Sequence, residues 1–90
     1  SGAKLPVVVV YYDPTDMEGT EKAGAADRFV QQNQSRFNLV KIDYTRNELV
    51  KKRYIFKENQ LPLAHLFING ELKAVIEDIS PENLNSWLDL

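Results

Sequence analysis

An unbroken run of β-branched and aromatic residues, Leu5 to Tyr12 (LPVVVVYY), limits the possible folds of this 90-residue chain more than any other feature. The run has no alternation of polar and apolar residues, so it predicts a strand that is buried on both faces. A sheet built around such a strand needs helices on both sides. Ninety residues with 43% hydrophobic content are enough for one small domain with one core.

The remaining elements are predicted from hydrophobic periodicity and from turn residues. The segment Asp13-Pro14-Thr15-Asp16 ends the first strand, and apolar residues at helical spacing follow it. The elements expected after the first strand are a helix that begins near Asp16–Thr20, a strand at Asn38–Asp43, a helix at Arg46–Lys57, strands at Leu63–Ile68 and Leu72–Glu77 joined by an Asn69-Gly70 hairpin, and a last helix with Ser80 as N-cap and Pro81 as first residue.

From this order, β-α-β-α-β-β-α, we expect an α/β domain with one four-stranded mixed sheet between helices. The first two strands are joined through a helix and should be parallel, whereas the last two form an antiparallel hairpin. In the last helix, Leu84, Trp87 and Leu88 form an apolar stripe. We therefore expect Leu84 and Trp87 to be buried, and Glu82 and Asp89 to be exposed.

Composition excludes several classes of function. The chain has no cysteine, which excludes a disulfide, a thiolate nucleophile and a cysteine-ligated metal. A single histidine and scattered acids do not predict a metal site, and we expect no cofactor. A net charge of −2 gives no reason to expect a nucleic-acid partner, and no apolar run is long enough to predict a membrane span. The basic cluster Lys51, Lys52, Arg53 and Lys57 is interpreted as a solvated helix face, because acids interleave with it.

The chain opens with Ser1-Gly2-Ala3 rather than methionine. Residues 1–4 are therefore interpreted as a remnant of tag cleavage with a short flank, and the domain is expected to span 5–90 of a larger protein. The compartment stays open between the cytoplasm and the lumen of the endoplasmic reticulum. Asn33-Gln34-Ser35 is a glycosylation triplet that matters only in the secretory pathway.

Several segments resemble the thioredoxin and glutaredoxin superfamily. Leu61-Pro62, directly before the third predicted strand, is similar to the family's cis-proline site. The stretch Pro62–Glu71 (PLAHLFINGE) resembles the family's proline, apolar strand and Asn-Gly-Glu turn. Leu39–Asp43 (LVKID) resembles its second core strand, and Ser80–Asp89 its last helix. The resemblance covers nearly all of residues 5–90 and implies a thioredoxin-like fold without the extra N-terminal strand and helix of full thioredoxins.

The departures from that family bear directly on function. Thioredoxins place Cys-x-x-Cys after the first core strand, at a helix N-terminus that lowers the pKa of the nucleophilic cysteine. The matching positions here are Asp16-Met17-Glu18-Gly19, and Val10 stands where the family buries an acid in the first strand. The resemblance therefore implies a domain without the family's nucleophile and proton relay, and we expect no enzyme activity.

The resemblance also places two loops side by side at one end of the sheet. In the family, the residue before the cis-proline offers its backbone to an extended peptide or to glutathione, and this form of strand addition needs no cysteine. The partner-binding residues predicted on this basis are Thr15, Asp16, Met17 and Glu18 after the first strand, and Gln60, Leu61 and Pro62 before the third.

Other candidate sites have simpler explanations. Asp13, Asp16 and Glu18 could form paired catalytic carboxylates or a cation site, but turn and helix N-cap positions account for acids there. His65 lies in the middle of a predicted strand with no partner in the sequence. We therefore expect a core histidine with satisfied hydrogen bonds, or a half-exposed one, rather than a catalytic base.

We expect a redox-inactive thioredoxin-like domain that serves as a protein-interaction or structural module. The alternative is a glutathione-binding domain similar to the N-terminal half of glutathione transferases. The segment Glu77–Ser80 matches that second family poorly, and a transferase needs a further helical domain. A glutathione titration separates the two hypotheses.

The strand order implied by the resemblance is second, first, third, fourth, which leaves Asn38–Asp43 at an edge. An uncovered edge offers unpaired backbone groups to another strand. Leu39, Val40 and Ile42 favour such pairing, and Lys41 is one charge that opposes it. We therefore expect this edge to contact a neighbouring domain of the larger protein, or a second copy in a homodimer.

Overall fold

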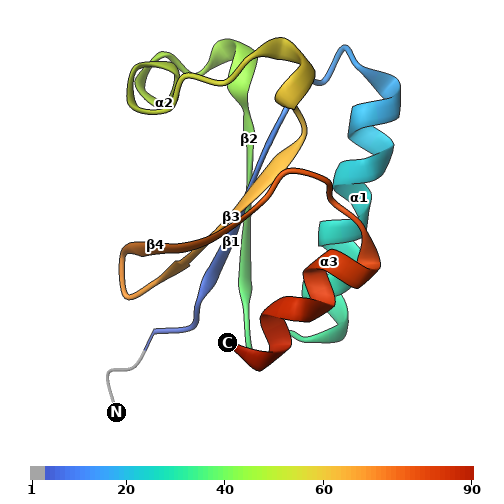
Figure 1. Cartoon of the computed structure of the whole chain (residues 1–90), viewed down its shortest axis with the longest axis vertical. Coiled ribbons are helices and arrows are strands. Elements are labelled where there is room, and N and C mark those ends of the chain that lie inside the picture. The colour runs from blue at the N-terminus through green and yellow to red at the C-terminus, as the bar shows by residue number, and fades with distance from the viewer. Residues whose placement is uncertain (1–3) are drawn as a thin grey trace.

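The structure is a computed structural model and is described for residues 4–90, so residues 1–3 of the expected tag remnant lie outside the described part. A four-stranded sheet in the order β2-β1-β3-β4 crosses the molecule (Figure 1). The β1–β2 pair is parallel, whereas β1–β3 and β3–β4 are antiparallel, which confirms the predicted mixed sheet. The strands are β1 (Val7–Tyr12), β2 (Asn38–Asp43), β3 (Leu63–Ile68) and β4 (Glu71–Ile76).

The helices lie on both sides of this sheet. In Figure 1, α1 and α3 run together along one side, and α2 lies on the other. The helices are α1 (Met17–Gln32), α2 (Glu48–Arg53) and α3 (Pro81–Asn85), with 3-10 turns at Tyr44–Arg46, Glu58–Gln60 and Ser86–Asp89. The predicted element order and α/β class are confirmed. Among residues 4–90, no helix is long and apolar enough to cross a membrane.

The main core lies between the sheet and the α1–α3 pair. Val8 and Val10 of β1 point to this side and are 0% exposed, because alternate residues of a strand face opposite sides of the sheet. Leu84 of α3 is also 0% exposed, and Trp87 is 3% exposed. The predicted burial of the last apolar stripe is therefore confirmed, and Glu82 and Asp89 are exposed as expected.

A smaller cluster occupies the opposite face of the sheet. Its buried members are Val9 and Tyr11 of β1 and Leu63 of β3. The partly buried Tyr54 and Phe56 pack against them, and the rings of Tyr11 and Phe56 lie 5.3 Å apart. The first strand is thus buried on both faces, as its sequence predicts, but by two clusters of different size.

The helix predicted at Arg46–Lys57 is wrong in extent. It is reduced to the six residues of α2, because Asn47 caps a new start and the backbone at Tyr54 is extended (φ −127°, ψ 114°). The Tyr44 hydroxyl donates to the Tyr54 carbonyl at 2.8 Å and accepts from the Phe56 N–H at 3.0 Å. These contacts draw the segment out of the helix and set Tyr54 and Phe56 against the sheet.

The β3–β4 hairpin turns at Asn69 and Gly70, which both have positive φ angles (53° and 80°). Two such residues are what a tight two-residue hairpin requires, so the Asn-Gly prediction is confirmed. The strand β4 begins at Glu71, one residue before the predicted start. A bulge between Leu66 and Phe67 shifts the register within the hairpin.

Candidate functional site

The end of the sheet that carries Pro62 brings together the two loops predicted to meet. Pro62 is buried directly before β3, and the Leu61–Pro62 peptide bond is cis. The first turn of α1 lies against this proline. A Cβ atom on Gly19 would lie 3.2 Å from Pro62 Cδ and 2.8 Å from Asp16 Oδ2, so only glycine fits there without a shift. We call the surface formed by Thr15–Glu18 and Gln60–Pro62 the proline end.

The α1 side of the proline end is an exposed rim. Thr15, Asp16, Met17 and Glu18 are all exposed, and Met17 is 84% exposed. Asp16 is the N-cap of α1, and its side chain accepts a hydrogen bond from the Gly19 N–H at 3.2 Å. The rim therefore presents one apolar side chain between two acidic ones.

The other side of the proline end is more enclosed. The Gln60 side chain accepts from the Lys57 N–H at 2.7 Å, and the Gln60 N–H donates to the Lys57 carbonyl at 2.9 Å. Leu61 is half-buried and packs against the cluster around Tyr11. Gln60 thus forms hydrogen bonds within its own turn, and Leu61 connects the proline end to the cluster on the α2 face of the sheet.

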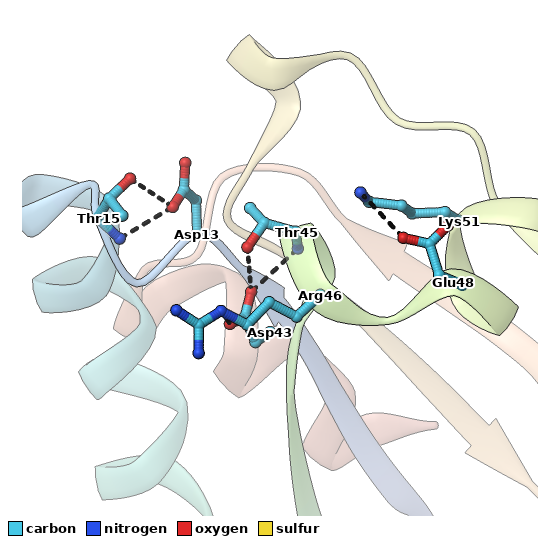
Figure 2. Close-up of polar contacts among 7 residues, drawn as sticks. All are labelled: Asp13, Thr15, Asp43, Thr45, Arg46, Glu48 and Lys51. Atoms are coloured by element: carbon cyan, nitrogen blue, oxygen red, sulfur yellow. Dashed lines mark hydrogen bonds and ion pairs between the residues drawn. The ribbon is translucent and has the colours of Figure 1, made fainter.

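Two aspartates lie where the parallel strands β1 and β2 end and make the same local contacts (Figure 2). Asp13 Oδ1 accepts from the Thr15 hydroxyl at 2.7 Å and from the Thr15 N–H at 2.9 Å, and these bonds lower the pKa of Asp13 below its usual value. Asp43 Oδ1 accepts from the Thr45 hydroxyl at 2.6 Å and from the Thr45 N–H at 3.0 Å. Turn formation accounts for both carboxylates.

The structure offers no metal centre around these carboxylates. Within residues 4–90, no group of three or more histidine, cysteine, aspartate or glutamate side chains could hold a metal ion. Arg46 Nε lies 3.7 Å from Asp43 Oδ2 and neutralises part of the charge at this corner. The acids here act as turn and helix caps.

The predicted edge strand β2 is the outermost strand next to β1. Leu39 packs against the main core and Ile42 against the smaller cluster, while Val40 is 44% exposed. The Lys41 ammonium lies 3.0 Å from the Asp27 carboxylate of α1. The Lys41 charge on this strand is therefore held against the α1 face of the sheet.

The sequence matches no protein-family model and no curated protein. Solved structures do resemble it. A malarial protein matches with a TM-score of 0.80 and 20% identity over 96% of each chain. Thioredoxin-2, described as a component of malaria parasite protein secretion machinery, matches with a TM-score of 0.80 and 20% identity over 94% of this chain and 82% of that one. The germline-specific thioredoxin Deadhead from Drosophila melanogaster matches with a TM-score of 0.79 and 15% identity over 94% of this chain and 79% of that one.

The chain has the thioredoxin fold. It carries that fold without any cysteine, so no thiol stands at the start of α1, where Asp16 and Gly19 lie against Pro62. Val10, where the family buries an acid, is 0% exposed and lies in the main core. The thioredoxin fold here holds the proline end in place with a carboxylate N-cap and a glycine.

Sequence reasoning missed the environment of His65. The predicted core position is confirmed, since the side chain is 3% exposed, but the predicted satisfied hydrogen bonding is wrong, because Nδ1 has no partner among the described residues. Tyr11, Tyr54 and Phe56 surround it, with ring centroids 4.8, 5.0 and 5.7 Å away. Tyr11 comes from β1 and the other two rings from the segment after α2, so no local spacing in the sequence signals the arrangement.

A groove of about 490 Å³ lies on the face of the sheet that carries His65, at the end away from Pro62. Its floor is apolar, and its lining residues are Lys4, Leu5, Val7, Val9, Asn38, Phe67, Asn69 and Gly70. The exposed side chains of Leu72 and Val75 lie on the same side of the sheet, since they pair in register with Phe67 and His65. α2 therefore covers only part of its face.

Proposed function

We propose that this chain is a redox-inactive thioredoxin-fold module that binds an extended segment of a partner protein at the proline end. The observation that carries the proposal is the direct packing of the first turn of α1 on Pro62 without a thiol in either loop. Disulfide exchange needs a thiolate as nucleophile, and the Asp16 carboxylate cannot take that role. What remains at this end is a shaped surface for binding.

The chemistry of the rim indicates the partner. Met17 is 84% exposed between Asp16 and Glu18, and Leu61 is half-buried on the other side of Pro62. Apolar contacts with Met17 and Leu61 and charge attraction to the two acids favour an extended segment with an apolar residue beside a basic one.

Selection from a displayed library of random peptides tests this proposal. We expect the enriched peptides to combine apolar and basic residues and to shift the amide resonances of Thr15–Glu18 and Gln60–Leu61 in the labelled chain. Met17→Ser should weaken their binding at least tenfold. Leu49→Ser is the matched control, because Leu49 is 80% exposed on α2 and lies outside the proline end. Shifts that map elsewhere, or equal effects of both variants, contradict the proposal.

Two solution assays separate the proposal from its enzymatic alternatives. Dithiothreitol should reduce insulin at the same rate with and without the protein, since the protein has no thiolate. Glutathione at millimolar concentration should leave the resonances of Gln60 and Leu61 unchanged. Catalytic turnover, or saturable shifts with glutathione, would establish the alternative instead.

The β2 edge is a second candidate contact, with a neighbouring domain or a second copy as partner. Its support is the position of β2 at the margin of the sheet, with Val40 44% exposed and Lys41 bound to Asp27 at 3.0 Å. Val40→Pro removes one backbone donor and should shift a dimer toward monomer in sedimentation equilibrium, with circular dichroism as the stability control. A chain that stays monomeric at millimolar concentration excludes self-pairing.

A further inference from the structure

His65 is the only histidine of the chain, and it occupies the middle of β3. Val9 of β1 and Val75 of β4 pair with it on either side. Its side chain is 3% exposed, and its Nδ1 is the one buried side-chain polar atom without a hydrogen-bond partner in residues 4–90. Buried polar groups are nearly always paired, so this nitrogen calls for an explanation.

The neighbours of the imidazole are rings. Tyr11 reaches it from β1, Tyr54 and Phe56 from the end of α2 and the segment after it, and Phe67 from β3 itself. All four meet it edge to face, with centroids 4.8 to 5.9 Å away. The strand β4 contributes Val75, which carries no charge.

The ionisable groups around this cage give the imidazolium no anionic partner. They are the phenols of Tyr11, Tyr54 and Tyr44, and the guanidinium of Arg53, whose Nε donates to the Tyr54 hydroxyl at 3.2 Å. Burial raises the pKa of Tyr11 to about 12, so that phenol stays neutral. Burial likewise lowers the pKa of His65 below its ordinary 6.5.

The segment Glu48–Phe56, the cover over the cage, has little buried surface. α2 has six residues, none of them buried, and Tyr54 and Phe56 are only half-buried. The Tyr44 hydroxyl holds the cover by its two bonds to the Tyr54 carbonyl and the Phe56 N–H. The cover can therefore move without disturbing the main core under α1 and α3.

We propose that protonation of His65 releases the segment Glu48–Phe56 from the sheet, so that acid opens the aromatic face of the domain. The closed state holds a neutral imidazole, because a charged one would be buried without a counter-ion and without an acceptor for its Nδ1 proton. Opening lets water reach Nδ1 and exposes Tyr11 and Leu63. This inference goes beyond partner binding at the proline end and does not depend on it.

The sign of the effect follows from proton linkage. The open state binds a proton with the ordinary imidazole pKa of about 6.5, whereas the closed state binds it only at lower pH. The equilibrium constant for opening therefore rises as pH falls below about 6.5, by up to about tenfold per pH unit. The rise stops once the pH falls below the closed-state pKa of His65.

Amide hydrogen exchange in the isolated chain measures this opening. From about pH 7 to about pH 5, in the range of an imidazole, and after correction for intrinsic exchange rates, protection at Lys51 and Tyr54 should fall by up to about tenfold per unit. These two amides donate to the carbonyls of Asn47 and Val50 and so report on α2. Protection at Val8 in the main core should stay higher than at these two amides at every pH, because its exchange requires opening of the main core.

Two variants supply the controls. His65→Phe keeps a ring in the cage and should make protection at Lys51 and Tyr54 independent of pH. Adding Thr20→His to His65→Phe returns a single imidazole at an exposed position of α1 and should not restore the dependence. If His65→Phe fails to fold, the wild-type titration still tests the proposal, because the chain has no other histidine that titrates in this pH range.

Three results would overturn the proposal. Constant protection at Lys51 and Tyr54 would show that His65 does not control the cover. Increased protection in acid would show that the aromatic faces stabilise the imidazolium by cation–π attraction. Equal protection at Val8 and at the two α2 amides would show that all three exchange only through global unfolding, and not by release of α2.

Discussion

The two faces of the sheet differ in what covers them. Under α1 and α3, a single cluster joins both helices to all four strands, and its residues include the fully buried Val8, Val10 and Leu84. On the opposite face the buried members of the cluster are Val9, Tyr11 and Leu63, with His65 buried beside them, and half of the partly buried side chains around them are aromatic. One face therefore supplies most of the stability of the fold, and the other is held by rings and a few hydrogen bonds.

The two faces of the sheet therefore differ in how easily they open locally. A cluster of close-packed buried side chains resists local opening, since each contact supports its neighbours. A cover of six helical residues with no buried side chain can open at a smaller free-energy cost. The α1–α3 face thus positions the proline end, and the α2 face is where the domain can respond to its surroundings.

The largest expected effect belongs to Trp87→Ala. Trp87 is 3% exposed in the main cluster, so its truncation should lower the free energy of unfolding by about 3–5 kcal/mol. Urea denaturation followed by circular dichroism measures the loss. A loss of less than about 1 kcal/mol, the size of an average substitution, would mean that the turn after α3, which carries Trp87, is peripheral and that the two faces are more alike than described.

Tyr44→Phe acts on the opposite face and should have a smaller effect. It removes the hydroxyl that bonds to the Tyr54 carbonyl and the Phe56 N–H, and it keeps the ring in the cluster. Loss of these two hydrogen bonds should lower the free energy of unfolding by about 1–2 kcal/mol. Exchange at the Phe56 amide should accelerate by a larger factor than exchange at Val8. Equal acceleration at both would contradict an independently held cover.

A matched pair of glycines tests how tightly α1 is fixed at the proline end. Gly19→Ala should lower the free energy of unfolding by about 1 kcal/mol, because its Cβ would displace the Asp16 cap and meet Pro62. Gly24→Ala, on the same helix, meets only Arg28 Nη1 at 3.5 Å and should stabilise by about 0.5–1 kcal/mol through helix propensity. Thermal unfolding distinguishes the two signs, and stabilisation by both would mean that α1 does not press on Pro62.

Much of the fold could be predicted because its signals are local. The apolar run of β1 predicts a central strand, and Ser80 with Pro81 predicts the start of α3, where the Ser80 hydroxyl accepts from the Asn83 N–H at 3.2 Å. The length of α2 could not be predicted in this way. Its helical pattern continues past Tyr54, but the helix ends there because the distant Tyr44 hydroxyl holds the following backbone.

The candidate site, too, could be predicted only in part. The meeting of Gly19 with Pro62 could be expected from the resemblance alone, since it follows from the order of the elements. The cage around His65 could not, because it depends on three segments that approach one another only in the folded chain. A histidine in mid-strand looks the same in the sequence whether its nitrogens find partners or not.

The smallest expected effect belongs to Leu49→Ala on α2. Leu49 is 80% exposed, and leucine and alanine have similar helix propensities, so the free energy of unfolding should change by no more than about 0.5 kcal/mol. This result would confirm that the outer side of α2 contributes almost nothing to stability, in contrast to Leu84, which is 0% exposed on α3. A loss above about 1 kcal/mol, typical of a side chain with packing partners, would show that Leu49 is covered in solution. Urea titrations of both alanine variants on the same day give the comparison directly, since the expected loss for Leu84→Ala is about 2–5 kcal/mol.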